Sequence, residues 1–358
     1  MFQVAKNPTR QILISTMRPD GASKADPVGL LVVDKPLGIT SHGVVSQIRR
    51  LAGTRRVGHA GTLDPDASGV LVLGLGRATK LLGYIAGSSK EYVATIRLGV
   101  STVTDDAAGS PLDAPGWKNP ERNKTDATAL IEEAMTRFRG SIEQIPSTVS
   151  AIKVDGKRAY ARARAGEDVV LKPRAVTVDR FEIVRNGAES PLRFEDVVVE
   201  LENQPAKTVR VVDVDVHVEC STGTYVRALA RDLGEALGTA GHLTALRRTR
   251  VGPWTIEDAV TLEGLWAASE EGQPLPLISL DQGALRVLEN VLVSQEGADR
   301  FAHGVAPAPA ECVNLPEGIL EDDGHVVALS AVGEPHRVLG LLRVQDGRFK
   351  TQSVIVAR

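Results

Sequence analysis

Residues 58–74 read GHAGTLDPDASGVLVLG, a glycine-rich loop followed by an apolar, β-branched run. The glycines at 58, 61 and 69 permit positive φ angles and let another molecule approach the backbone closely. Pro65 fixes φ directly after Asp64 and removes one backbone donor. The pattern predicts that Asp64 is a carboxylate held on a stiff loop at the edge of a sheet. The alternative is an Asx-turn, in which Asp64 bonds only to its own loop.

Strands and helices are expected on both sides of this loop. Residues 28–34 (VGLLVVD) and 70–75 have the composition of buried strands, and residues 90–98 alternate polar and apolar as a half-buried strand does. Thr40 or Ser41 is expected to cap a helix over residues 42–51, and residues 78–85 predict a short helix.

The remaining chain also mixes the two kinds of element, so the sequence predicts an α+β fold. Residues 102–125 are polar and turn-rich and predict a surface loop. The expected helices cover residues 126–138 and 224–237, and the expected strands cover 197–199 and 209–218. Residues 269–276 have the composition of a linker, and the part from Leu280 predicts a small β-rich domain with eleven acidic against seven basic residues.

Composition excludes several classes of protein. With 42 Lys and Arg against 45 Asp and Glu, the net charge is −3, which argues against a polycation but allows a local basic surface. Cys220 and Cys312 are far apart, so neither a disulfide framework nor a Cys-based zinc site is expected, and the chain has the cysteine usage of an intracellular protein. No run approaches ~18 apolar residues, so no membrane partner is expected. Residues 1–27 are expected to be a disordered tail, with a transit peptide as the alternative.

Familiar cofactor motifs are weak or missing. The run VLVLGLGRATK (residues 70–80) has a partial G-x-G after a strand, but the third glycine is absent. Tight strand-to-helix packing is the favoured interpretation. The chain has neither G-x-x-x-x-G-K-[ST] nor G-x-S-x-G, so no nucleotide cofactor and no serine-hydrolase chemistry are predicted.

Two further side chains stand out where strands and helices begin. Tyr92 opens the strand over residues 90–98, where it is either an ordinary strand aromatic or a neighbour of the Asp64 loop. Arg227 lies in the first turn of a helix, a place where the helix dipole disfavours a cation. It is either an exposed arginine that tolerates this cost or the partner of a buried carboxylate, for which Asp64 is a candidate.

Two basic stretches are candidates for contact with phosphates. Residues 150–164 contain Lys153 and Arg158, with Tyr160 interleaved, which fits either a solvated basic helix or a segment that follows a nucleic-acid backbone. Residues 247–250 add a second cluster of three arginines.

Taken together, these segments resemble the bacterial tRNA pseudouridine-55 synthases, the TruB family. The similar stretches occur in the family's order and cover most of residues 28–255. They are GLLVVDKPLGITSH (29–42), RRVGHAGTLDPDASGVLVLGLGRATK (55–80), KEYVATIRLG (90–99), IPSTVSAIKVDGKRAYARARAG (145–166), CSTGTYVRALARDLG (220–234) and GHLTALRRTRVG (241–252).

The resemblance implies a role for each matching residue. Asp64 falls on the family's catalytic aspartate, Tyr92 on the active-site tyrosine that stacks on the target base, and Arg227 on the arginine that pairs with the aspartate. Tyr225 falls on a tyrosine beside that arginine, and Leu246 on an apolar residue that lines the uracil pocket.

Other matching residues are implied to brace the site or to hold RNA. Lys35 belongs to a motif that braces the active-site loop, and His59 falls on a histidine that contacts the flipped nucleotide region. Residues 141–166, with Lys153, Arg158 and Tyr160, match the family's RNA-gripping insertion. Residues 186–208 are enlarged compared with the family pattern.

The resemblance also implies a fold and a reaction. The fold would be a mixed, mainly antiparallel central sheet with flanking helices over residues 28–275 and a small C-terminal PUA-like domain over residues 280–358. This second domain either contacts RNA or braces the first. The expected reaction is isomerisation of uridine 55 in the T arm of tRNA by a cytoplasmic monomer without cofactor or metal. The base would leave the stack, and the carboxylate would attack the ribose, attack the ring or abstract a ribose proton.

Two other classes of function stay open at this stage. One is an RNA-binding or RNA-folding module in which catalysis is secondary. The other is a nucleoside or glycoside hydrolase that uses Asp64 and Asp66, although neighbours at i and i+2 make a poor carboxylate pair for hydrolysis.

Overall fold

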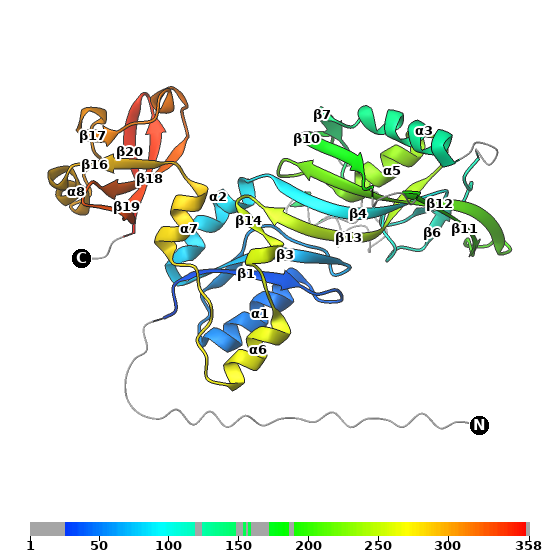
Figure 1. Cartoon of the computed structure of the whole chain (residues 1–358), viewed down its shortest axis with the longest axis horizontal. Coiled ribbons are helices and arrows are strands. Elements are labelled where there is room, and N and C mark those ends of the chain that lie inside the picture. Colours follow the sequence, from blue (N-terminus) through cyan, green and yellow to red (C-terminus); the bar gives the residue numbers. More distant parts are fainter. Residues whose placement is uncertain are drawn as a thin grey trace.

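The computed structural model describes residues 26–118, 124–147, 153–154, 157–158, 172–185 and 190–355 (Figure 1). The expected tail lies outside these ranges except for its last two residues. A large sheet crosses the middle and right of Figure 1, and a smaller sheet lies at the left. Helices pack on both sheets, so the predicted α+β class is confirmed.

The large sheet has eleven strands within the described residues, in the order β15-β1-β3-β13-β4-β12-β10-β7. Strands β2, β11 and β14 pair onto β3, β12 and β13. The β1–β15 and β3–β13 pairs are parallel and the other pairs are antiparallel, as the resemblance predicted. The strands are β1 (Gly29–Lys35), β2 (Val57–His59), β3 (Ala67–Leu75), β4 (Lys90–Leu98), β7 (Gly140–Gln144), β10 (Arg174–Ile183), β11 (Leu192–Val199), β12 (Lys207–Cys220), β13 (Gly241–Val251), β14 (Trp254–Thr255) and β15 (Val260–Thr261).

Helices cover this sheet in three places. Helices α1 (Ser41–Ala52) and α6 (Leu262–Glu270) form one apolar cluster with β1 and β3, and α3 (Lys124–Thr136) and α5 (Val226–Ala236) form another with β4, β10, β12 and β13. The 3₁₀ helix η1 (Gly76–Leu81), α2 (Leu82–Gly87) and α7 (Leu280–Val287) contribute to a third, between the two sheets (Figure 1). Shorter elements are β5 (Ser101–Thr102), β6 (Pro111–Asp113), β8 (Lys153–Val154), β9 (Lys157–Arg158) and the 3₁₀ helix η2 (Ile256–Asp258).

Local sequence signals account for several of these bounds. The Thr40 hydroxyl caps α1 by accepting a hydrogen bond from the Gly43 amide, 2.9 Å, and Val44, Val45 and Ile48 form the buried face. Strand β4 has the predicted bounds. The helix expected over residues 78–85 is divided between η1 and α2.

The prediction of a surface loop over residues 102–125 is wrong for part of its described residues. Residues 101–113 contain the β5–β6 hairpin, and Trp117 and Asp105 are buried. The amide of Leu243 on β13 donates to the Asp105 carbonyl, 3.0 Å, which docks the turn on the large sheet. Asp105 and Trp117 become buried here because their polar groups find partners on distant elements, Arg231 for the Asp105 carboxylate and the Arg210 carbonyl for the Trp117 amide.

The second sheet has the order β17-β16-β18-β19-β20. Its elements are β16 (Asn290–Val293), α8 (Gln295–Ala302), η3 (Pro309–Glu311), β17 (Cys312–Asn314), η4 (Ile319–Glu321), β18 (Val326–Ala331), β19 (Glu334–Gln345) and β20 (Arg348–Val354). Leu30 of β1 and Leu81 of η1 share one buried cluster with Val338 and Leu341 of β19. The second sheet therefore braces the first through a common apolar core.

The contact between β3 and β13 depends on a glycine. Gly69 has φ +106°, and a Cβ there would lie 2.1 Å from the Arg248 carbonyl oxygen. We expect Gly69→Ala to lower the free energy of unfolding by about 3 kcal/mol, through backbone strain and the steric clash. Urea denaturation measures this. Gly83→Ala, where a Cβ meets nothing within 4 Å, is the control, and equal stability of the two variants would contradict the prediction.

Candidate active site

The Asp64 loop is fixed from one side by the turn after β1. The Lys35 ammonium, fully buried, donates hydrogen bonds to the carbonyls of Pro36, Ile39 and Pro65 at 2.8–3.2 Å. The Ser41 hydroxyl is hydrogen-bonded to both the amide and the carbonyl of Leu63. Lys35 thus braces the backbone beside Asp64, which is the position that the resemblance implied for it.

A buried arginine fixes the same loop from the other side. Arg248 on β13 is 1% exposed, and its guanidinium donates to the carbonyls of Gly61, Thr62 and Val70 at 2.8–3.3 Å. Arg248 is also the register partner of Tyr92 on β4. Burial raises the pKa of the Tyr92 hydroxyl above its ordinary value, so the phenol is neutral at physiological pH.

Asp64 and Arg227 form an ion pair. The Arg227 Nη2 and Asp64 Oδ2 atoms are 3.2 Å apart. The Arg227 side chain is 8% exposed and that of Asp64 is 43% exposed, so the carboxylate stands at an opening while the cation lies behind it. The first turn of α5 therefore tolerates a cation because carboxylates surround it.

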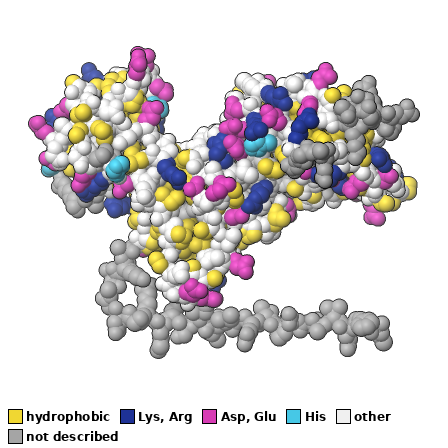
Figure 2. Space-filling model, viewed as in Figure 1, with side chains coloured by type: hydrophobic (Ala, Val, Ile, Leu, Met, Phe, Trp, Pro, Cys, Tyr) yellow, Lys and Arg dark blue, Asp and Glu magenta, His cyan; other side chains and the backbone are white. Residues whose placement is uncertain are grey.

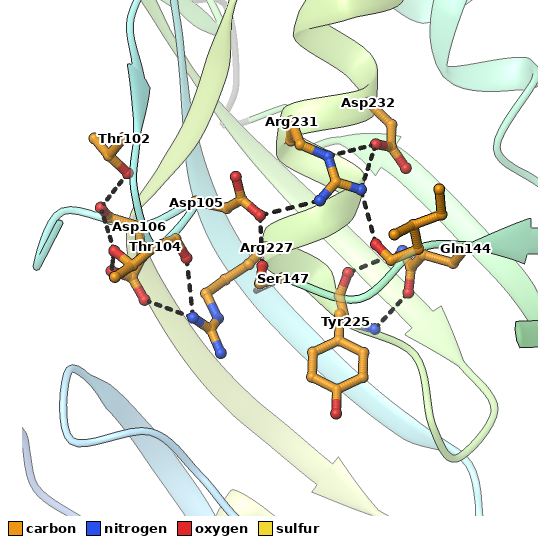
Figure 3. Close-up of polar contacts among 11 residues, drawn as sticks. Thr102, Thr104, Asp105, Asp106, Gln144, Ser147, Tyr225, Arg227, Arg231 and Asp232 are labelled. Carbon is orange, nitrogen blue, oxygen red and sulfur yellow. Dashed lines mark hydrogen bonds and ion pairs between the residues drawn. The ribbon is translucent and has the colours of Figure 1, made fainter. Parts of the chain in front are cut away.

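A second carboxylate holds the other side of Arg227. The Arg227 Nη1 atom lies 3.3 Å from Asp106 Oδ2 and donates a hydrogen bond to the Thr104 carbonyl, 2.9 Å (Figure 3). Asp106 in turn accepts a hydrogen bond from the Thr104 hydroxyl. Arg227 is thus held between carboxylates from two loops that are distant in sequence.

A cleft of about 330 Å³ lies beside the Asp64–Arg227 ion pair. Its lining includes Asp64, Tyr92, Tyr225, Arg227 and Leu246. The cleft falls within the size range of small-molecule sites, ~300–1,000 Å³. It combines an apolar side chain and two aromatic rings with one ion pair at the opening. Such a site suits a flat heterocycle whose attached sugar meets the carboxylate.

The other predicted site residues lie elsewhere. His59, half-buried on β2, is not among the residues that line the cleft, and burial lowers its ring pKa below 6.5. Lys153 and Arg158 are register partners in the β8–β9 ladder. Tyr160 lies outside the described residues.

The interpretation of residues 247–250 as a phosphate-binding cluster is wrong for Arg248, whose side chain is buried in the sheet. Arg248 is buried as described. Arg250 pairs with Glu91 on β4 and Glu219 on β12, and Arg247 pairs with Asp34 on β1, so each of these partners lies on another strand of the large sheet. On the face shown in Figure 2, acidic and basic side chains lie side by side over the large sheet rather than in one basic patch. β13 is an inner strand, so the sheet around it supplies the counter-charges.

Comparison with known proteins gives the family. The model for the TruB family pseudouridylate synthase N-terminal domain matches residues 49–226, and that for the tRNA pseudouridylate synthase B C-terminal domain matches residues 227–291. A tRNA pseudouridine synthase B of Arthrobacter sp. (strain FB24) is 49% identical over 85% of this chain and 92% of its own length. The chain belongs to the TruB family of pseudouridylate synthases.

Other TruB-family relatives and solved structures agree. A tRNA pseudouridine synthase B of Mycobacterium leprae is 47% identical over 92% of this chain and 90% of its own. A chain in the crystal structure of a Cbf5-Nop10-Gar1 complex is 26% identical, with a TM-score of 0.61 over 92% of this chain and 84% of that one. No helix within the described residues of this TruB-family chain is long and apolar enough to span a membrane.

The sequence did not single out the turn of this pseudouridylate synthase that carries Asp105 and Asp106. Asp106 contacts Arg227, and Asp105 lies beside it, within the segment predicted to be a surface loop. The signal in the sequence was the pair of adjacent aspartates in TVTDD (residues 102–106). That signal alone does not indicate burial.

A buried lysine in the cleft of this pseudouridylate synthase gives a pH prediction. Lys90 donates to the Ala86 and Ser88 carbonyls, and burial, with Arg248 nearby, lowers its pKa to about 8. At pH values between about 8 and the ordinary pKa of 10.5, Lys90 keeps its proton in the unfolded chain but has released it in the folded chain. The free energy of unfolding of the wild type should therefore rise with pH across this window relative to Lys90→Met. Urea denaturation of both proteins measures it, and a constant difference would contradict the prediction.

Proposed function

We propose that this pseudouridylate synthase converts uridine 55 in the T arm of tRNA to pseudouridine, with Asp64 as the catalytic residue. The relatives named tRNA pseudouridine synthase B support the substrate class. The observation that carries the proposal is the Asp64–Arg227 pair at the opening of a cleft lined by Tyr92 and Leu246. The cytoplasm, where tRNA is found, is the proposed location.

The reaction breaks the bond from ribose C1′ to N1 of uracil and forms a bond from C1′ to C5, and the proton on C5 is exchanged for one on N1. Atoms and electrons balance without an oxidant or reductant, so the proposal includes no redox cofactor. Asp64, oriented by Arg227, is placed to attack the ribose, attack the ring or abstract a ribose proton. Each role requires the ionised carboxylate at the opening of the cleft.

The target base has to leave the RNA stack to reach Asp64. We assign Tyr92 to stacking on the base and Leu246 to the apolar wall that holds uracil while it turns. Tyr225 lines the same cleft beside Arg227. We assign Lys153, Arg158 and Tyr160 to contacts with the RNA backbone. We assign His59 to contact with the region of the flipped nucleotide.

Asp64→Asn tests the catalytic assignment. We expect the rate constant for pseudouridine formation on an unmodified T-arm stem-loop to fall by about 10²–10⁴-fold or more, while the stem-loop still binds. Chemical modification followed by primer extension measures pseudouridine. Asp66→Asn is the matched control on the same loop and should keep its activity. Normal turnover by Asp64→Asn would end the assignment, and release of free uracil by the wild type would indicate a hydrolase instead.

A charge reversal tests the contact with RNA. We expect Lys153→Glu with Arg158→Glu to weaken stem-loop binding and to make the slope of log K against log salt shallower by about 1 for each phosphate that is no longer neutralised. Filter binding at several salt concentrations measures both. Arg185→Glu is the control, because Arg185 is exposed and pairs with Glu132. An unchanged slope would contradict the assignment of Lys153 and Arg158.

A further inference from the structure

The turn over residues 104–106 has an uncommon backbone conformation. Asp105 has φ +57°, in the left-handed region that non-glycine residues rarely occupy, and it is only 9% exposed. Its amide donates to the Thr102 carbonyl, and its carbonyl accepts from the Leu243 amide. The turn is thus fixed to β13, the strand that also carries Leu246 into the cleft.

The two carboxylates of this turn point to different arginines (Figure 3). Asp106 contacts Arg227, and Asp105 contacts Arg231, with 3.2 Å between Asp105 Oδ2 and Arg231 Nη1. Arg227 and Arg231 are one helical turn apart on α5 and therefore lie on one face of the helix. Two ion pairs therefore join the turn to the helix, and one of them includes Arg227, which also pairs with Asp64.

Asp105 also reaches a third element. Its Oδ2 accepts a hydrogen bond from the Ser147 hydroxyl, and Ser147 is fully buried. Arg231 Nη2 donates to the carbonyl of Ile145, 2.8 Å. Arg231 thus attaches the segment after β7 directly to α5, and Asp105 attaches it indirectly through its ion pair with Arg231.

The same segment supports the wall of the cleft. The Gln144 side chain accepts from the Tyr225 amide, 2.7 Å, and donates to the Tyr225 carbonyl, 3.0 Å. Tyr225 and Arg227 both line the cleft. Residues 144–147, the 104–106 turn and the start of α5 therefore form one polar unit behind the catalytic ion pair, and the Asp105 carboxylate bridges the segment after β7 to α5.

We propose that Asp105 is a positioning residue for the reaction. It acts through Arg231 and Ser147 to fix the 104–106 turn against α5. The adjacent Asp106 then holds Arg227 in the orientation that presents Asp64 to the cleft. This inference rests on the proposed function, and it adds a residue that lies behind the ion pair rather than at the reacting atoms.

The test is Asp105→Asn, which keeps the shape of the side chain but removes its charge. We expect the single-turnover rate constant at saturating T-arm stem-loop to fall by about tenfold or more, because small misplacements of catalytic groups are costly. The dissociation constant for a stem-loop that already contains pseudouridine should stay within about threefold of the wild type, because Asp105 is not assigned to RNA contact. Asp113→Asn, in the same segment and bonded to the Ala114 amide, is the matched control and should keep the wild-type rate.

Ser147→Ala gives an independent measurement, and it serves alone if Asp105→Asn does not fold. It should also lower the rate constant. The rate of the double variant should fall by less than the product of the two single effects, because both changes act on the same Ser147–Asp105 hydrogen bond, one by weakening its acceptor and the other by removing its donor. A merely structural role predicts a lower melting temperature with an unchanged rate constant for the folded protein, and that result would overturn the proposal. Absence of pseudouridine with the wild type would instead overturn the proposed function, and this inference with it.

Discussion

The site depends on the ion pair between Asp64 and Arg227, which joins the loop before β3 to the first turn of α5. The arginine is buried and the carboxylate is partly exposed, so the cation is shielded from water and needs its acidic partners, whereas the carboxylate keeps a free side toward the cleft. Two carboxylates on one arginine limit where its guanidinium can lie. The orientation of Asp64 is therefore set by side chains that are distant in sequence.

Buried cations also hold the backbone around the cleft. Lys35, Lys90 and Arg248 donate to main-chain carbonyls, and burial lowers the pKa of both lysines to about 8. Carbonyl oxygens carry only partial charge, so these contacts do not cancel the charge on the cations. These contacts fix the backbone, because each cation holds together two or three main-chain carbonyls from the segments around the cleft.

The parts of the fold that local pattern determines could be predicted. β4 has its predicted bounds, and α1 begins where Thr40 was expected to cap it. The motifs also located Asp64, Tyr92 and Arg227, which line one cleft. Burial of Asp105 could not be predicted, because its partners Arg231 and Ser147 come from other elements. Burial of Arg248 could not be predicted for the same reason, since its partners are carbonyls of Gly61, Thr62 and Val70 on other parts of the chain.

The apolar core shared by the two sheets connects the C-terminal part of the chain to the strand that leads to the Asp64 loop. Leu30 of β1 and Leu81 of η1 are buried together with Val338 and Leu341, and β1 ends at Lys35, whose ammonium holds the Asp64 loop. Detachment of the second sheet would expose these four apolar side chains to water and loosen β1, the strand that leads to the Asp64 loop. The second sheet thus shields apolar side chains of β1 and η1 from water, and a polar side chain at Val338 or Leu341 would weaken that contact.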